Sequence, residues 1–199
     1  MSRSVWDALM ASVEQAFEKC PDLPDFMAFP QDITFGDVDP VLLTPYHGFI
    51  AQTGLSAGPF DTLRDGFMAA APHARWRQHY TADEISQDFV DQFGCYCLVG
   101  EEGPFQSATL RAWMVYMPPG LHYPWHQHPA EELYFVVSGK ADFHAAGRES
   151  RALGAGEVSF HASDQPHAMT TAADPVMCLV MWRNGFETGP ALSKSEAVA

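Results

Sequence analysis

Two histidines and a glutamate lie close together in the sequence, at a spacing that suits a metal site. His126 and His128 are two residues apart, so on a β-strand both imidazoles point to the same side. Glu132 follows shortly afterwards, and Pro129 permits a turn into a second strand. On that strand Glu132 and Tyr134 share one face and could face the histidine pair. The segment therefore predicts a cluster of two imidazoles, one carboxylate and one phenol.

A further imidazole comes from a later part of the chain. The segment from Gly156 to His167 ends in a histidine at the start of another predicted strand. Two or three imidazoles with a single carboxylate suit a first-row divalent ion and leave open positions for water or substrate. We predict that His126, His128, Glu132 and His167 hold one divalent transition metal ion per chain, which could be Fe, Mn, Zn, Co or Ni.

Short β-strands must bring these side chains together. From Cys95 onward the sequence contains short, often alternating runs that are rich in β-forming residues. Turn signals separate the runs, among them Ser138-Gly139-Lys140 and Gly154-Ala155-Gly156. The runs lie at 95–99, 107–117, 132–137, 140–146, 157–161, 167–171 and 176–183. Many short strands at this spacing predict an antiparallel sandwich or barrel.

The first third of the chain favours helices. Apolar residues recur on one face of a predicted helix over 4–20. Two more helices are expected, from Asp61 to Ala71 and from Thr81 to Phe93, each with its first residue as the N-cap. Pro, Gly and Asp are frequent over 21–60, which predicts loops with at most short helices. The chain is thus expected to be mainly β, with an N-terminal helical extension over residues 1–94 packed on a β-barrel over residues 95–199.

Composition narrows the classes of partner. The 199 residues include 11 Lys and Arg against 25 Asp and Glu, a formal charge of −14 with nine neutral histidines. Such an acidic surface repels phosphate backbones and anionic lipid headgroups, so we expect neither nucleic acid nor membrane as a partner. No apolar run is long enough for a transmembrane helix. Without a secretory signal or a Cys-x-x-Cys pair, the chain is expected to be cytoplasmic with reduced thiols.

The histidine cluster resembles the two motifs of the cupin superfamily. The second motif is similar to the segment from Gly156 to His167, although Ala162 and Asp164 stand near the places of its usual Pro-x-Gly. The resemblance covers residues from about 95 to 185 and implies a cupin β-barrel, a double-stranded β-helix or jelly roll, with a metal ion inside. The first motif is matched at every spacing by Gly120, His126, His128, Glu132 and Gly139.

Three further features narrow the resemblance: His122-Tyr123-Pro124 before the histidine pair, Glu132-x-Tyr134, and a helical N-terminal third in a chain of this length. In these features the chain is similar to the bacterial dimethylsulfoniopropionate (DMSP) lyases of the Q type, which cleave DMSP to dimethyl sulfide and acrylate. The likeness implies that His128, Glu132 and His167 are metal ligands, with His126 beside them.

The same likeness implies two catalytic tyrosines, Tyr134 near the metal and Tyr123 as a second active-site tyrosine, and it leaves open which one is the base. DMSP carries a carboxylate and a sulfonium, and its cleavage requires removal of a weakly acidic proton next to the carboxylate. A divalent ion would stabilise the charge that develops there. A neighbouring cation would also lower the pKa of a tyrosine hydroxyl toward that of a usable base.

The substrate expected from this likeness is a small zwitterionic sulfonium. Aromatic faces attract onium groups, and Trp182, Trp125 and Tyr123 are the candidate faces for substrate binding.

Two other functions stay open at this point. The chain could be another metal-dependent cupin enzyme, such as a dioxygenase acting on a small thiol or diketone, because the cupin fold hosts several reactions. It could also be a non-enzymatic cupin that binds a small molecule. The −14 charge and the lack of a helix-turn-helix pattern argue against a DNA-binding regulator. Met and Phe side chains on exposed faces of the N-terminal helices could form a homodimer.

Overall fold

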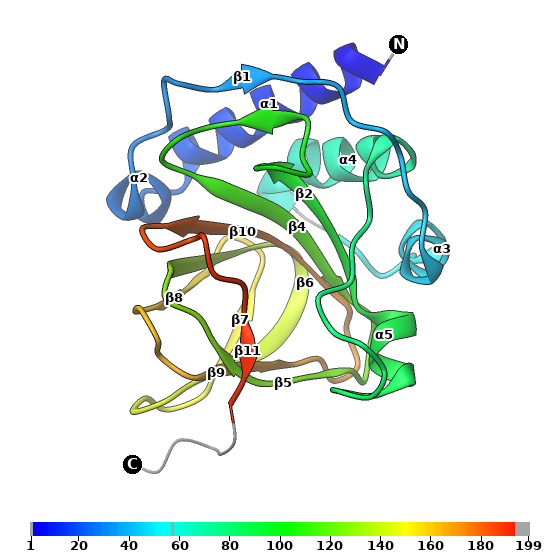
Figure 1. Ribbon diagram of the computed structural model, residues 1–199, viewed down its shortest axis with the longest axis vertical. Helices are drawn as coiled ribbons and strands as arrows, with labels where there is room; N and C mark the ends of the chain where they lie inside the picture. Colours follow the sequence, from blue (N-terminus) through cyan, green and yellow to red (C-terminus); the bar gives the residue numbers. More distant parts are fainter. Residues whose placement is uncertain (1, 57, 194–199) are drawn as a thin grey trace.

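The fold is mainly β, with a sheet rolled into a barrel and helices from the N-terminal third against one side of it (Figure 1). The computed structural model describes residues 2–56 and 58–193. The helices within these residues are α1 (Ser2–Lys19), α2 (Asp22–Phe26), α3 (Thr44–Ala51), α4 (Asp61–Ala70) and α5 (Gln87–Gln92), with short 3₁₀ turns η1 (Gly58–Phe60) and η2 (Ala71–His73).

Eleven strands are formed within the described residues, and they pair antiparallel apart from β2 with β3. Along the sheet the order is β1-β3-β2-β4-β10-β6-β9-β5-β11, while β7 and β8 also pair with β6. The strands are β1 (Thr34–Phe35), β2 (Gly94–Val99), β3 (Phe105–Gln106), β4 (Arg111–Met117), β5 (His122–Gln127), β6 (Glu131–Ala145), β7 (Arg151–Gly154), β8 (Val158–His161), β9 (His167–Thr170), β10 (Val176–Arg183) and β11 (Ala191–Leu192).

Side chains alternate between two apolar cores along the central strands. On β6, Leu133 and Phe135 join the core beneath the N-terminal helices, whereas Tyr134 and Val136 join the core inside the barrel. Because each strand is covered on both faces, β2 and most of β4 and β10 are buried throughout. The predicted alternation that turns Glu132 and Tyr134 away from Leu133 is confirmed.

The turn predicted at Ser138-Gly139-Lys140 is wrong, because β6 runs through it as one long strand. Gly139 has φ of +77°, and a Cβ there would collide with the carbonyl oxygen of Pro175. At this point β6 leaves its partners β10 and β8 and continues against β7 and β9. Gly139 therefore allows a bend within a strand and does not form a hairpin turn.

The third predicted helix begins later than expected. Thr81 is not its N-cap, because Glu84 accepts hydrogen bonds from both the backbone N–H and the hydroxyl of Thr81 and closes a separate turn. Ser86 caps α5 instead, its Oγ accepting from the Phe89 N–H at 3.1 Å. Asp61 is likewise the first residue of α4 rather than its N-cap.

The N-terminal helices share a core with the sheet. Trp6 and Leu9 of α1 are buried in the same apolar cluster as Met114 of β4 and Leu133 of β6, and α1 and α4 lie along the outer side of β2 and β4 in Figure 1. The division of the chain between residues 94 and 95 stays a prediction. Cys20, Cys95, Cys97 and Cys178 are buried and free. None of the helices in the described residues is long and apolar enough to cross a membrane.

Candidate metal centre and active site

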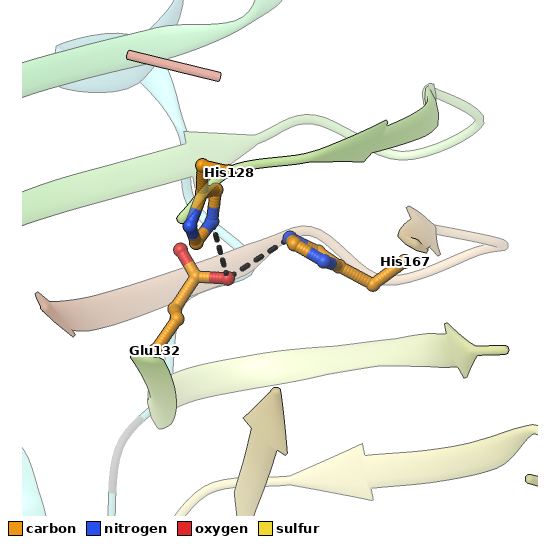
Figure 2. A group of neighbouring side chains, drawn as sticks. All are labelled: His128, Glu132 and His167. Atoms are coloured by element: carbon orange, nitrogen blue, oxygen red, sulfur yellow. Dashed lines mark ion pairs between the residues drawn. The ribbon is translucent and has the colours of Figure 1, made fainter. Parts of the chain in front are cut away.

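Three buried side chains from different strands meet inside the barrel (Figure 2). His128 directly follows β5, Glu132 lies on β6 and His167 begins β9. One ligand atom from each lies within 4.8 Å of the others. Glu132 Oε2 is 3.4 Å from His128 Nε2 and 2.9 Å from His167 Nε2. Strand pairing thus brings together residues that are up to 39 positions apart in sequence.

Backbone carbonyls fix the tautomers of the two histidines. His128 Nδ1 lies 3.0 Å from the Ala130 carbonyl, and His167 Nδ1 lies 2.8 Å from the Gln165 carbonyl. Since a carbonyl only accepts, each Nδ1 carries the proton, and each Nε2 presents a lone pair to Glu132 when the ring is neutral. This arrangement, with the second ring nitrogen held by a carbonyl, is typical of histidines that bind metals.

The three converging atoms fit a divalent metal ion. Glu132 Oε2, His128 Nε2 and His167 Nε2 are buried and form no hydrogen bond within the described residues. A buried polar atom without a partner is costly, so three at one point indicate a missing common partner. Two imidazole nitrogens and one carboxylate oxygen are the donor set that first-row divalent ions accept.

The electrostatics of the site favour an ionised carboxylate. Burial acts to raise the pKa of Glu132, but His128 and His167 outweigh it and hold that pKa well below its usual range. Burial likewise acts to lower the pKa of His128, whereas the charge of Glu132 raises it overall. The anionic carboxylate that a cation would need is therefore already present at neutral pH.

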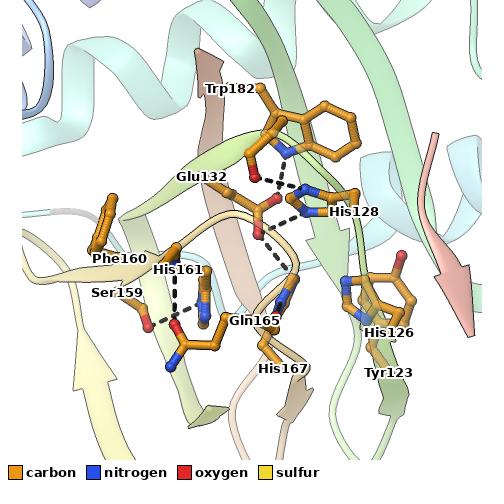
Figure 3. Close-up of polar contacts among 12 residues, drawn as sticks. Tyr123, His126, His128, Glu132, Ser159, Phe160, His161, Gln165, His167 and Trp182 are labelled. Atoms are coloured by element: carbon orange, nitrogen blue, oxygen red, sulfur yellow. Dashed lines mark hydrogen bonds and ion pairs between the residues drawn. The ribbon is translucent and has the colours of Figure 1, made fainter. Parts of the chain in front are cut away.

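Trp182 of β10 holds the second oxygen of Glu132. Its indole Nε1 donates to Glu132 Oε1 at 2.6 Å, and its ring lies 4.0 Å from the ring of His128 (Figure 3). Trp182 and Glu132 lie opposite each other in the register of β10 and β6. Sequence reasoning placed Trp182 in the site as an aromatic face for the substrate, and it did not foresee the bond to Glu132.

His126 lies beside the three-residue group but is not part of it. Its ring centroid is 4.1 Å from that of His167 and 6.4 Å from that of His128. Its Nδ1 lies 2.8 Å from the Pro124 carbonyl, so its Nε2 also carries a lone pair. Burial and the neighbouring His167 hold the pKa of His126 well below 6.5, and the ring is neutral.

A small cavity of about 30 Å³ lies next to the candidate metal centre. His79 and Pro190 also border it, whereas the predicted substrate residue Trp125 does not. The ring of Trp125 lies 6.2 Å from His144 instead. The side chains that bring chemistry to the cavity wall are Trp113, Tyr123, His126, Glu132, Tyr134 and Trp182.

The fold and the sequence are similar to those of known DMSP lyases. The family described as dimethylsulfoniopropionate lyase matches residues 51–178. Dimethylsulfoniopropionate lyase DddQ of Ruegeria pomeroyi is 43% identical over 188 residues, which are 94% of each chain. Its crystal structure superposes with a TM-score of 0.92 at 42% identity over 96% of both chains. A structure from work on the DMSP lyases RdDddP and RnDddQII gives a TM-score of 0.93 at 36% identity, over 98% of this chain and 100% of the other.

The chain belongs to the DMSP lyase family. Its fold is the cupin barrel with an N-terminal helical extension, as the motifs indicated.

In this DMSP lyase family member, Tyr123 and Tyr134 both face the cavity. The Tyr123 ring stacks on His126 at 3.9 Å, and its hydroxyl is 3.2 Å from that of Tyr80. Apart from this contact, the hydroxyls of Tyr123 and Tyr134 form no hydrogen bond within the described residues. Tyr80 belongs to the N-terminal extension and escaped sequence reasoning, because no local pattern marks a loop tyrosine as an active-site contact.

His161 lies behind the candidate metal centre. It stacks on His167 with ring centroids 4.1 Å apart, and its Nε2 is 3.2 Å from the Ser159 hydroxyl (Figure 3). Burial lowers the pKa of His161 to about 3, and His167 adds to that effect. His161 is therefore a neutral ring that fixes the position of His167 from the side.

The loop before His167 explains the departure from the cupin Pro-x-Gly pattern. Asp164 has φ of +56°, a left-handed conformation that glycine adopts most easily and that Asp tolerates better than most residues. Its backbone N–H donates to the His128 carbonyl at 2.8 Å. The loop thus keeps a glycine-like turn without glycine and connects two of the three converging residues.

Proposed function

We propose that this protein cleaves DMSP to dimethyl sulfide and acrylate with one divalent transition metal ion per chain, held by His128, Glu132 and His167. The observation that carries the proposal is the convergence of three buried, unpartnered ligand atoms beside a tyrosine-lined cavity in a chain of the DMSP lyase family. His126 offers a fourth ligand atom, a nitrogen, at the edge of this group, and its lone pair is available to the metal.

The reaction is a β-elimination. When bound, the ion supplies a positive charge that stabilises the carboxylate as the adjacent proton leaves and that lowers the pKa of a nearby phenol. The Cα–H bond and the C–S bond break, a carbon–carbon double bond forms, and the electron pair of the C–S bond leaves with dimethyl sulfide. The protein must therefore supply a base at Cα and a site that tolerates a sulfonium.

Tyr134 is the proposed base. It lies two residues from Glu132 on the face of β6 that points into the barrel, and its ring centroid is 6.5 Å from that of His167. Tyr134 lines the cavity beside Glu132, where its hydroxyl can reach a bound substrate. Burial, with Glu132 adding to it, raises the pKa of Tyr134 well above 10, so the hydroxyl needs a nearby cation to become a base.

Tyr123 is the proposed second catalytic tyrosine. Its hydroxyl is paired with that of Tyr80, and its ring is held against His126. Burial and the neighbouring Tyr80 raise the pKa of Tyr123 well above 10 as well. A hydroxyl that stays protonated and is held in place can orient the substrate in the cavity, and the ring of Trp182, which borders the same cavity, offers an aromatic face to the sulfonium. Trp125 would reach the substrate only if it left its place near His144.

The decisive experiment measures dimethyl sulfide in the headspace over metal-loaded protein with DMSP, together with acrylate in solution. Chelated protein is the control, and it should release neither product. Loading with Fe, Mn, Zn, Co or Ni in turn identifies the metal, and elemental analysis gives its stoichiometry. Oxygen uptake with a small thiol and no acrylate from DMSP would instead support another metal-dependent cupin enzyme and contradict the proposal.

Paired variants separate the two tyrosines. Tyr134→Phe should lower kcat by about 10²–10⁴-fold, the usual loss when a general base is removed. Tyr123→Phe should mainly raise KM, because this hydroxyl is proposed to orient the substrate. Tyr116→Phe is the matched control, because it removes a hydroxyl that is bonded to Gln52 away from the cavity. Full kcat in Tyr134→Phe would exclude that residue as the base.

The location and assembly of the protein are part of the proposal. We expect a cytoplasmic enzyme that acts on a small zwitterionic sulfonium and forms a homodimer. The exposed Met and Phe faces expected on the N-terminal helices are not found among the described residues, where the exposed large apolar side chains are Leu42 and Ile50. Light scattering of the purified protein measures the assembly, and cell fractionation measures the location.

A further inference from the structure

A second, larger cavity adjoins the one at the metal centre. Its volume is about 460 Å³, and His79, Trp113 and Trp182 border both cavities. The inner cavity has room for little more than a water molecule, so a ligand of several heavy atoms must extend from the inner cavity into the outer one. Trp113 of β4 lies where the two meet.

The indole N–H of Trp113 has no partner. Its Nε1 is buried and forms no hydrogen bond within the described residues, and the whole side chain is 8% exposed. Its neighbour Trp182, 4.8 Å away between ring centroids, donates to Glu132, and Trp76 in the other core donates to the Ala71 carbonyl at 2.9 Å. Buried donors almost always find an acceptor, so the Trp113 N–H indicates an acceptor that arrives with a ligand.

The cations of the outer cavity have partners already. Arg77 lies 3.4 Å from Glu102. Arg111 donates to the carbonyls of Ser107 and Leu110, and its guanidinium lies 4.2 Å from the ring of Phe186. Acidic groups outnumber these cations on the cavity wall, with Glu101, Glu102 and Glu187.

We propose that Trp113 is a substrate-binding residue whose indole N–H donates to the carboxylate of the substrate. The proposal rests on DMSP as the substrate. An indole N–H can only donate, and the carboxylate is the one acceptor that DMSP offers, since its sulfonium has none. A hydrogen bond to an ionised acceptor is about twice as strong as one between neutral groups. The sulfonium then points toward the outer cavity, where the glutamates and aromatic rings suit a cation.

Propionate tests this assignment, because it keeps the carboxylate and lacks the sulfonium. Its dissociation constant is measured by calorimetry with the zinc-loaded wild-type protein and with Trp113→Phe, which removes the N–H and keeps an aromatic ring. Trp76→Phe is the matched control, because it removes a buried indole N–H outside both cavities. Trp113→Phe should weaken propionate binding by about tenfold or more, as expected for a lost bond to a charged group, whereas Trp76→Phe should leave it unchanged.

A measurement on the wild-type protein does not depend on how the variant folds. In zinc-loaded protein labelled with ¹⁵N, propionate should shift the indole proton signal of Trp113 downfield, as a new hydrogen bond to an anion does, and leave that of Trp76 in place. Unchanged propionate affinity in a folded Trp113→Phe variant, or an unmoved Trp113 signal at saturating propionate, would overturn the proposal. Because propionate is not cleaved, these results are independent of whether the protein releases dimethyl sulfide from DMSP.

Discussion

At the scale of single residues, Trp182 fixes the orientation of the Glu132 carboxylate in the candidate metal centre. Its N–H fixes Glu132 Oε1 at 2.6 Å and leaves Oε2 toward the histidines, while its ring covers His128. Partners of this kind orient a metal ligand without touching the metal. Trp182 is therefore a positioning residue for the carboxylate, in addition to being part of the cavity wall.

Trp182→Phe should weaken metal binding by about 10–100-fold, the usual effect of removing such a partner, because Glu132 loses the bond that orients it. The phenyl ring keeps the contact with His128. Competition with a chromophoric chelator measures the affinity, and the visible spectrum of the cobalt-loaded protein reports the ligand geometry. Trp76→Phe again serves as the control, and equal metal affinity in both variants would show that the Glu132 bond is not needed.

At the scale of elements, β6 is the strand on which the site depends. Its first half carries Glu132 and Tyr134 against β10 and β8, and its second half pairs with β7 and β9. The bend at Gly139 allows one strand to serve both halves of the barrel. Since His167 begins β9, the same bend also sets the distance between Glu132 and His167.

Gly139→Ala should destabilise the protein by at least about 3 kcal/mol for two reasons. The added Cβ would collide with the Pro175 carbonyl, and alanine is strained in the left-handed backbone conformation of this position. Gly147 provides a matched control, with φ of +76° against +77° and open space around the added Cβ. Gly147→Ala should cost only the backbone contribution, about 1 kcal/mol. Urea denaturation gives both free energies of unfolding, and equal losses would show that the collision with Pro175 is relieved at no cost.

At the scale of the whole molecule, the N-terminal extension is joined to the barrel by polar contacts as well as by the shared core. Asp32 in the extension accepts hydrogen bonds from the Ser107 hydroxyl at 2.8 Å and from the Ala108 N–H at 2.7 Å, just before β4. Tyr80 makes a second connection through the Tyr123 hydroxyl. The extension is therefore attached both to the outer sheet and to the active-site wall.

The Asp32 contacts should make stability depend on pH. The Ala108 N–H, followed by the Ser107 hydroxyl, lowers the pKa of Asp32 below its ordinary value. A lowered pKa in the folded state stabilises the protein above the unfolded pKa of about 3.9, and this contribution is lost as the pH falls through the folded-state pKa. Asp32→Asn should therefore lower Tm at pH 7, with a smaller difference from wild type at pH 3.

Asp39→Asn, at an exposed position in the same segment, is the control for the change of charge alone. Differential scanning fluorimetry from pH 3 to pH 7 follows all three proteins. If the difference in Tm between the wild-type protein and Asp32→Asn stayed constant over this pH range, the expected role of the Asp32 carboxylate would be contradicted.

Local spacing in the sequence determined much of the site. The interval of two between His126 and His128, the alternation through Glu132 and Tyr134, and the later His167 were enough to predict a metal site, and the resemblance to the cupin motifs implied that it lies inside a cupin barrel. Each of these depends on strand periodicity, which the order of residues fixes. The resemblance to DMSP lyases rested on His122-Tyr123-Pro124, on Glu132-x-Tyr134, and on a helical N-terminal third in a chain of similar length.

Tertiary structure alone decided the contacts across the barrel. Strand pairing set Trp182 beside Glu132, folding of the extension brought Tyr80 to Tyr123, and the meeting of two cavities left the Trp113 N–H without an acceptor. It also showed that Gly139 bends a strand rather than ending one. These features join residues from separate strands and loops, and the distances between such residues follow from packing and register, which no local pattern in the sequence encodes.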